Sequence, residues 1–124
     1  MPGFFPHFLA GNALFLMGKY YMHVKDTNVT VKKQLGLYTI CIISSIIPDT
    51  FLGVYYTLHI GNPALMGTMH TFLHYIISPT ALFIFLILDV ISPLKYKFFW
   101  IIGIICILVH VIMDVFIQET GIWI

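Results

Sequence analysis

Charged residues are scarce in this chain of 124 residues, and arginine is missing altogether. Lysine and arginine together number 6, and aspartate and glutamate number 5. Apolar residues make up 60% of the chain and the mean hydropathy is +0.97, more apolar surface than a water-soluble domain of this size can bury. The composition therefore excludes a soluble globular protein and indicates a protein that lies in a lipid bilayer.

Net charge and cysteine content are also low. A formal net charge of +1 without arginine provides no basic surface for a nucleic acid, so we expect no direct nucleic-acid binding. The two cysteines, Cys41 and Cys106, lie in apolar runs and lack the Cys-x-x-Cys spacing of redox and metal motifs. We expect both to be buried packing residues.

Long apolar stretches cover residues 4–22, 35–60, 69–92 and 98–118. At ~1.5 Å rise per residue, each is about as long as the ~30 Å hydrocarbon core of a bilayer is thick. The connections, including 61–68 and 93–97, are short, so consecutive helices should be antiparallel neighbours. The sequence predicts an all-α polytopic membrane protein, a four-transmembrane-helix bundle that forms a single domain over residues 1–124.

The lysines indicate how this bundle is oriented. All of them lie around the first connection or in the third, at Lys19, Lys25, Lys32, Lys33, Lys95 and Lys97. The positive-inside rule then makes connections 1–2 and 3–4 cytoplasmic and both termini extracytoplasmic. Because no basic segment precedes the first apolar run, we expect the first helix to be retained in a multi-pass protein of the plasma membrane.

Ionisable residues inside the predicted spans are the candidates for function, because each is costly in a bilayer. Two aspartates near mid-membrane would together cost roughly 5–7 kcal/mol on the insertion scale. Position along each span places one group in the extracytoplasmic half, namely His7, Asp49, His59, His70, His74, His110 and Asp114. Asp89 and His23 fall on the cytoplasmic side. The sequence thus predicts a cluster of imidazoles and carboxylates at one end of the bundle.

Spacing within this group favours a metal site. His70 and His74 are four residues apart, as are His110 and Asp114, so each pair projects from one face of a helix and can bind one ion or two adjacent ions. Mixed Asp and His ligands are typical of zinc and also suit other first-row divalent ions. We take as candidate ligands of a divalent metal, preferably one or two zinc ions, His7, Asp49, His70, His74, His110 and Asp114.

Non-metal explanations of the same residues remain open at this point. His110 and Asp114 can be a hydrogen-bonded pair that joins two helices. Asp49 can be a charge beside a kink caused by Pro48. His59 lies ten residues after Asp49 and about 80° around an ideal helix from it, which favours an interfacial position.

Several motifs, taken in order, resemble those of a known family. They are the opening Met1-Pro2-Gly3-Phe4-Phe5-Pro6-His7, then Ile47-Pro48-Asp49, Met69-His70-Thr71, and His110-Val111-Ile112-Met113-Asp114 followed by Thr120-Gly121. The ordered set resembles the membrane-bound metal-dependent hydrolases of the LexA-binding, inner-membrane-associated (YdjM-like) family. It is more distantly similar to the zinc-dependent phospholipase C and P1-nuclease superfamily.

The resemblance implies a zinc-binding helical hydrolase. It implies that Asp49, His70, His110 and Asp114 surround one metal, with Asp114 bridging towards a second metal near His7. The chain departs from the family pattern directly after Asp49 and directly before His70, and there His59 and His74 are the candidates to replace the missing ligands.

These observations favour a membrane-embedded metal-dependent hydrolase. We expect a metal-activated water to attack a phosphoester or other ester bond, with Asp49 or Asp114 as the catalytic base. A site among helices in the outer half of the bilayer favours a lipid or lipid-linked substrate. The alternatives are a metal-ion or proton carrier that uses the same cluster and a haem protein with two histidine ligands. Whether two copies form a homo-oligomer in the membrane stays open.

Overall fold

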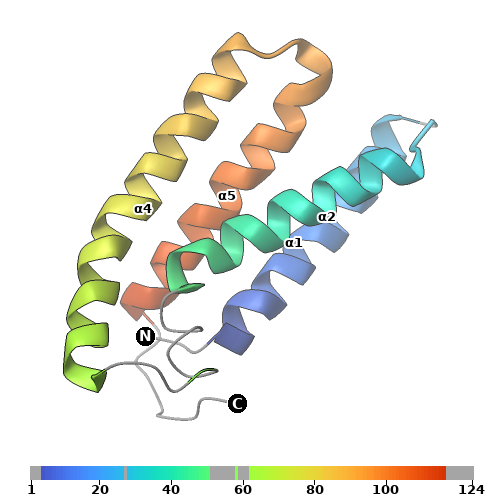
Figure 1. Ribbon diagram of the computed structural model, residues 1–124. Helices are drawn as coiled ribbons and strands as arrows, with labels where there is room; N and C mark the ends of the chain where they lie inside the picture. The colour runs from blue at the N-terminus through green and yellow to red at the C-terminus, as the bar shows by residue number, and fades with distance from the viewer. Residues whose placement is uncertain (1–3, 27, 51–57, 59–61, 117–124) are drawn as a thin grey trace.

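A computed structural model describes residues 4–26, 28–50, 58 and 62–116 (Figure 1). Helices account for almost all of this, and no strand occurs within these ranges, which confirms the predicted all-α class. The elements are the α-helices α1 (Phe4–Lys25) and α2 (Val31–Ile46), the short 3-10 helix η1 (Ile47–Asp49), and the α-helices α4 (Pro63–Ile91) and α5 (Leu94–Phe116).

Capping residues explain why two of the helices, α2 and α4, begin earlier than the apolar stretches. The Thr30 hydroxyl accepts a hydrogen bond from the Lys33 amide at 3.3 Å, and α2 therefore begins at Val31 rather than at residue 35. The Asn62 side chain accepts one from the Ala64 amide at 2.9 Å, and Pro63 follows it as the first residue of α4. The expected connections 61–68 and 93–97 are therefore mostly helical, since α4 starts at Pro63 and α5 at Leu94.

The predicted span 35–60 does not continue as a regular α-helix. The α-helical part ends at Ile46, and a 3-10 turn over Ile47–Asp49 follows. Pro48 accounts for the change, because proline has no backbone N–H and its ring crowds the preceding turn of an α-helix. Within the rest of that expected span, residues 51–57, 59 and 60, with His59 among them, lie outside the described residues.

Two helices are long and apolar enough to cross a membrane, α4 over Gly67–Ile91 and α5 over Leu94–Phe116. Only 6% of the most apolar window of α4 is buried within the bundle. Large apolar side chains such as Phe72, Phe83 and Val90 are consequently exposed along this helix.

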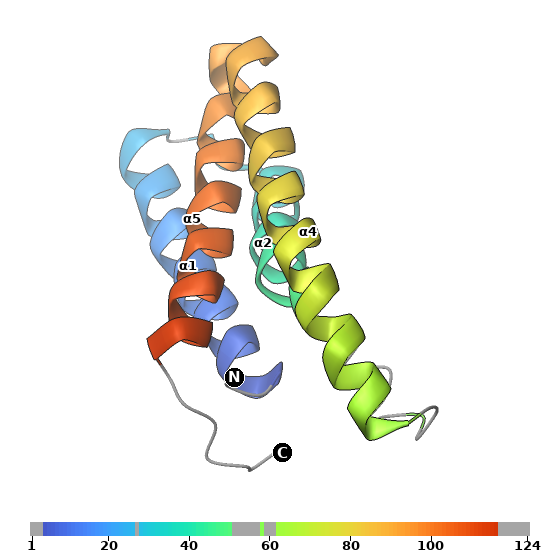
Figure 2. The same cartoon turned by 90° about the vertical axis from the view of Figure 1, so that its left-hand side faces the viewer.

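Helix α5 lies at the centre of the arrangement, because α1, α2 and α4 all pack against it (Figure 2). Buried apolar side chains at the middle of the bundle include Leu37, Cys41 and Cys106, which confirms the expected packing role of the two cysteines. A Cβ at Gly103 of α5 would lie 2.6 Å from the Phe85 ring, so glycine is what allows α4 and α5 to approach this closely.

The two short connections lie at the same end of the bundle (Figure 1). The α1–α2 connection carries the exposed ion pair of Lys33 with Asp26, whose ammonium group holds the pKa of the Asp26 carboxyl below its ordinary value. Ser92 and Pro93 alone separate α4 from α5. The first turns of α1, η1 and the last turns of α5 lie together at the opposite end.

Candidate metal centre

Imidazoles and carboxylates from separate elements meet at the end of the bundle opposite the short connections. His7 comes from the first turns of α1, Asp49 ends η1, and His110 and Asp114 come from α5. One ligand atom from each of these residues lies within 4.8 Å of one from every other. Helix α4 adds His74, whose Nε2 is 2.7 Å from Asp114 Oδ2. We call these five residues the His/Asp cluster.

His7 links the two carboxylates. Its Nε2 is 3.2 Å from Asp114 Oδ1 and 3.3 Å from Asp49 Oδ2, and its side chain is 1% exposed. Gly11 lies one turn further along α1, where an added Cβ would be 2.8 Å from the Ser45 hydroxyl oxygen and 3.2 Å from the Cys41 carbonyl oxygen. The absence of a side chain at Gly11 therefore brings α1 against α2 and carries His7 towards Asp49.

The backbone of α2 fixes the orientation of His110. Its Nδ1 lies 2.8 Å from the Ser45 carbonyl oxygen. Since a carbonyl oxygen can only accept a hydrogen bond, the His110 Nδ1 must carry the hydrogen and donate this bond. In the neutral ring Nε2 then presents a lone pair to the cluster, 3.2 Å from Asp114 Oδ2 and 3.8 Å from Asp49 Oδ1. Histidines that bind metals commonly donate their second N–H to a carbonyl in this way.

The three imidazoles form a row with His110 in the middle. The ring centroids of His7 and His110 are 4.0 Å apart, and those of His110 and His74 are 5.1 Å apart. Nε2 of His74 is 2.9 Å from Nε2 of His110. Since His110 Nε2 presents a lone pair, His74 Nε2–H can donate a hydrogen bond to it.

Burial makes the charge of the cluster important. The side chains of Asp49 and Asp114 are 2% and 7% exposed, and His7 and His110 are just as buried. Two buried carboxylates beside neutral imidazoles carry two negative charges, which is costly without a compensating cation. A divalent cation would neutralise them.

The separations between the side chains also suit a cation. Nitrogen and oxygen ligands at ~2.0 Å from a tetrahedral zinc ion are ~3.3 Å from one another. The contacts of His7 with both carboxylates and of His110 with Asp114 measure 3.2 to 3.3 Å. Asp114 Oδ2 accepts no well-aligned hydrogen bond from a described residue despite its close imidazole neighbours. The proximity of one ligand atom from each of His7, Asp49, His110 and Asp114 means that the group can hold a metal ion.

The remaining predicted residues fall into two groups. His70 lies on α4 one turn before His74, but its side chain, like the whole of His59, lies outside the described residues. His23 is exposed in the last turn of α1, at the end of the short connections. Asp89 lies near the end of α4, close to the same connections. The structure therefore separates both His23 and Asp89 from the His/Asp cluster, as their positions in the sequence predict.

Two supporting features were not predicted from the sequence. They are the carbonyl of Ser45, which orients His110, and Gly11, which sets the distance between α1 and α2. Pro48, three residues after Ser45, is the signal that could have indicated the first of these. Because proline has no backbone N–H, a carbonyl in the preceding helical turn loses its usual donor and can bind a side chain instead.

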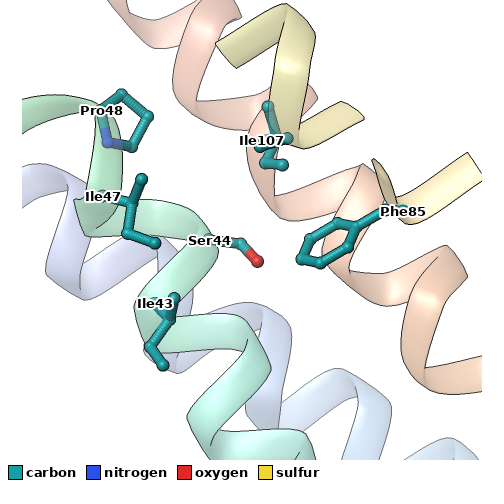
Figure 3. Close-up of a pocket in the computed structure, with 7 residues that line it drawn as sticks. Ile43, Ser44, Ile47, Pro48, Phe85 and Ile107 are labelled. Atoms are coloured by element: carbon teal, nitrogen blue, oxygen red, sulfur yellow. The ribbon is translucent and has the colours of Figure 1, made fainter. Parts of the chain in front are cut away.

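A small hollow beside η1 is separate from the cluster. Its volume is about 30 Å³, and it is lined by Ile43, Ser44, Ile47, Pro48, Ala81, Phe85 and Ile107. The Ser44 hydroxyl points into it, with Ile107 and Phe85 on the far side (Figure 3). A water needs two to four polar partners, and the lining offers one hydroxyl among apolar side chains, so this hollow is a packing gap.

Comparisons with known proteins identify no relative. No family model, no curated protein and no solved structure matches this chain. The resemblance of its motifs to the membrane-bound metal-dependent hydrolases therefore stays a prediction.

Proposed function

We propose that this chain is a membrane-embedded metal-dependent hydrolase with the His/Asp cluster as its active site. The observation that carries the proposal is the convergence of two buried carboxylates and two buried imidazoles, with one ligand atom of each within 4.8 Å of the others. His7, Asp49, His110 and Asp114 would hold the ion. The donor set of nitrogen and oxygen atoms favours zinc among the divalent metals.

Hydrolysis is the chemistry that such a centre would support. A divalent ion held by these four residues that also takes a water, as zinc does when it expands from four to five ligands, would lower the pKa of that water to ~7 and polarise the ester or phosphoester bond that is attacked. The protein supplies carboxylates that can orient the water and take its proton. Asp114 is the better placed of the two aspartates, because it also lines an open cavity between α4 and α5, whereas Asp49 is almost wholly enclosed.

His74 complements Asp114 at the edge of the site. Its side chain is 13% exposed, more than those of the other cluster residues, and it lines the same cavity. From that position the imidazole can bind the substrate headgroup or donate a proton to the leaving group. We therefore assign His74 a role in handling substrate and leave the remaining four residues to hold the metal.

The membrane placement is part of the proposal. We infer four spans, built from α1, α2 with the residues that follow it, α4 and α5, in the plasma membrane, with both short connections on the cytoplasmic side. The apolar exposed surfaces of α4 and α5 and the lysines beside the short connections support this arrangement. The His/Asp cluster then lies towards the extracytoplasmic side, within reach of a lipid or lipid-linked substrate.

The geometry favours this proposal over the alternatives. The 4.0 Å between the His7 and His110 rings leaves no room for a flat macrocycle, which argues against a haem held by these two histidines. A carrier needs polar groups along a path through the membrane. The described cluster instead lies at one end of the bundle, with the apolar residues Leu37, Cys41 and Cys106 next along the core.

The test is a hydrolysis assay on detergent-purified protein loaded with zinc, using phosphodiester, phosphomonoester and carboxylic ester lipids. We expect turnover that chelation abolishes. His110→Ala should reduce it by at least the ~10- to 100-fold that loss of a supporting hydrogen bond alone costs metal sites. His23→Ala is the matched control, because His23 is exposed and far from the cluster. Metal-loaded protein that hydrolyses none of these lipids but moves metal ions across liposome membranes would establish the carrier instead.

A further inference from the structure

A cavity beside the His/Asp cluster lies between α4 and α5. Its volume is about 360 Å³, within the ~300–1,000 Å³ typical of ligand sites. It is lined by Thr71, His74, Tyr75, Ser78, Pro79, Leu82, Val111, Asp114 and Val115. Because His74 and Asp114 belong both to the cluster and to this lining, the cavity begins at the candidate metal centre.

The lining changes from polar to apolar along its length. His74, Ser78 and Leu82 follow one another at intervals of four residues, so they form one stripe on α4. At ~1.5 Å rise per residue the stripe extends ~12 Å along the helix. Val111 of α5 also lines the cavity. The cavity therefore has the polarity of an amphiphile, with a charged end at the cluster and an apolar end deeper among the helices.

Ser78 lies between the polar and apolar ends of the cavity, and its hydroxyl makes no hydrogen bond within the described part of the bundle. The residue is 3% exposed, and its hydroxyl has no hydrogen-bond partner among the described residues. Elsewhere on α4 the exposed hydroxyls of Thr68 and Thr71 each donate to the carbonyl four residues earlier, both at 3.0 Å. A buried hydroxyl left unpaired is costly, so a ligand that accepts a hydrogen bond from it would be favoured.

The next residue adds to this polarity. Pro79 stands inside α4 and has no N–H, so it cannot donate to the Tyr75 carbonyl four residues earlier. Both Tyr75 and Pro79 line the cavity beside Ser78. The helix thus interrupts its own hydrogen bonding where the cavity passes from its polar to its apolar end.

We propose that this cavity, the α4–α5 groove, binds an acyl-ester lipid that enters sideways from the bilayer. The headgroup lies at His74 and Asp114, the ester carbonyl accepts a hydrogen bond from the Ser78 hydroxyl, and the acyl chain lies along Leu82 and Val111. The assignment of the headgroup end rests on the proposed function. A lipid is the fitting occupant because α4 and α5, which form the groove, are also the two helices apolar and long enough to cross a membrane.

The protein contains an internal control for apolar binding. A larger cavity of about 540 Å³ between α1 and α5 is lined by Leu14, Met17, Gly18, Tyr20, Tyr21, Phe98, Ile101, Ile102 and Ile105. It includes no residue of the His/Asp cluster. Lipid that merely coats apolar surface would enter this larger cavity at least as readily as the α4–α5 groove.

The test is photo-crosslinking of the full chain in nanodiscs. The probe is a diacyl glycerophospholipid with a diazirine in one acyl chain, compared with the ether-linked lipid that lacks the carbonyl. Peptide mapping should place the crosslinks of the ester lipid in residues 75–82 and 111–115. The ether lipid should label these residues about tenfold less at equal concentration, since it gives Ser78 no carbonyl oxygen to bind.

Variants at two matched serines isolate the hydrogen bond. Ser78→Ala should remove the preference for the ester lipid. Ser44→Ala should retain it, because Ser44 is equally buried at 3% and equally unpaired but points into the separate hollow beside η1 (Figure 3). Leu82→Trp should reduce crosslinking of both lipids by filling the apolar end. Its effect does not depend on the serine.

Two outcomes would overturn the proposal. One is equal crosslinking of the α4–α5 groove and the α1–α5 cavity, and the other is an ester preference that survives in Ser78→Ala. The hydrolase proposal is tested separately, because crosslinking needs no turnover. Labelling confined to the α4–α5 groove without any hydrolysis would refute the hydrolase proposal and support lipid binding in the groove. Hydrolysis with equal labelling of both cavities would refute only the proposal of lipid binding in the groove.

Discussion

Each carboxylate of the His/Asp cluster contacts more than one imidazole. Asp114 has Oδ1 near His7 and Oδ2 near both His74 and His110, and Asp49 lies near His7 and His110. Such mutual contacts stabilise the folded protein when a cation sits among them. Without a cation the two buried aspartates repel each other. The same residues therefore affect stability in opposite directions in the metal-loaded and metal-free protein.

Asp114→Asn tests this reversal, because the amide keeps the shape of the side chain and removes its charge. Without metal, we expect the thermal unfolding midpoint of Asp114→Asn to be equal to or above that of the wild type. Zinc at 100 times its dissociation constant should stabilise the wild type by about 2.7 kcal/mol and the variant far less. Asp26→Asn, an exposed change in the α1–α2 connection, should keep the full response to zinc.

An equal zinc response in Asp114→Asn and the wild type would contradict this account. So would an equal loss of stability in Asp114→Asn with zinc and with chelator, because that result is expected of a hydrogen-bonded cluster without metal. Differential scanning fluorimetry in detergent measures both quantities.

For single residues of the cluster the sequence was informative, because ionisable side chains are conspicuous in apolar segments. His7, Asp49, His74, His110 and Asp114 could be selected by their depth along the predicted spans, and the structure brings them together. Depth alone does not say which way a side chain points. Contacts made by backbone atoms, such as that of the Ser45 carbonyl with His110, leave no mark in the pattern of residue types.

Among the elements, η1 and the α1–α2 contact do most to position the cluster. η1 turns Asp49 into the bundle, where it is 2% exposed, and Gly11 lets α1 carry His7 up to it. Neither α1 nor α2 with η1 provides the whole cluster. The distance between His7 and Asp49 depends on how closely α1 and α2 approach each other.

Gly11→Val should separate α1 from α2 and lower zinc affinity while the helical content is kept. The added side chain would meet Ser45 and the Cys41 carbonyl, and overpacking of this kind costs about 1–3 kcal/mol. Gly67→Ala is the matched control, because a Cβ there would have nothing within 4 Å and a helical alanine is favoured over glycine. Circular dichroism and zinc titration measure the two effects. Unchanged zinc affinity in Gly11→Val would show that this contact does not position His7.

Over the described residues, the predicted elements were helical as expected and imprecise at their ends. Hydropathy follows apolar stretches, whereas helices begin where a cap satisfies the first amides, as Thr30 and Asn62 do. The short polar segments before α4 and α5 therefore looked like connections although most of their residues are helical. Among the residues that the structure describes, Pro48 is the one place where the type changed, from a continuous helix to a 3-10 turn.

In the whole molecule, the short connections and the His/Asp cluster lie at opposite ends of the bundle (Figure 1). Lysines flank the connections, with Lys32 and Lys33 in the first turn of α2 and Lys95 and Lys97 in the first turn of α5. On the positive-inside rule we propose that the cluster faces away from the cytoplasm. The proposed substrate would then enter from the extracytoplasmic leaflet.

Cysteine labelling in intact cells tests the orientation. Cys41 and Cys106 are buried, so an added cysteine reports on its own position. A membrane-impermeant maleimide should label Ala64→Cys, at the start of α4, and should label Lys32→Cys and Lys95→Cys only after the cells are opened. Labelling of the two lysine positions in intact cells would place the cluster on the cytoplasmic side instead.

The central claim is that the His/Asp cluster binds a divalent metal, and metal content tests it most directly. Detergent-purified wild-type protein and His23→Ala, after incubation with zinc and removal of excess, should each retain at least about one ion per chain by elemental analysis. His110→Ala should retain far less, since it removes a nitrogen that lies among the two carboxylates and His74. Wild-type protein that retains no stoichiometric metal, or His110→Ala that retains as much as the wild type, would contradict the account.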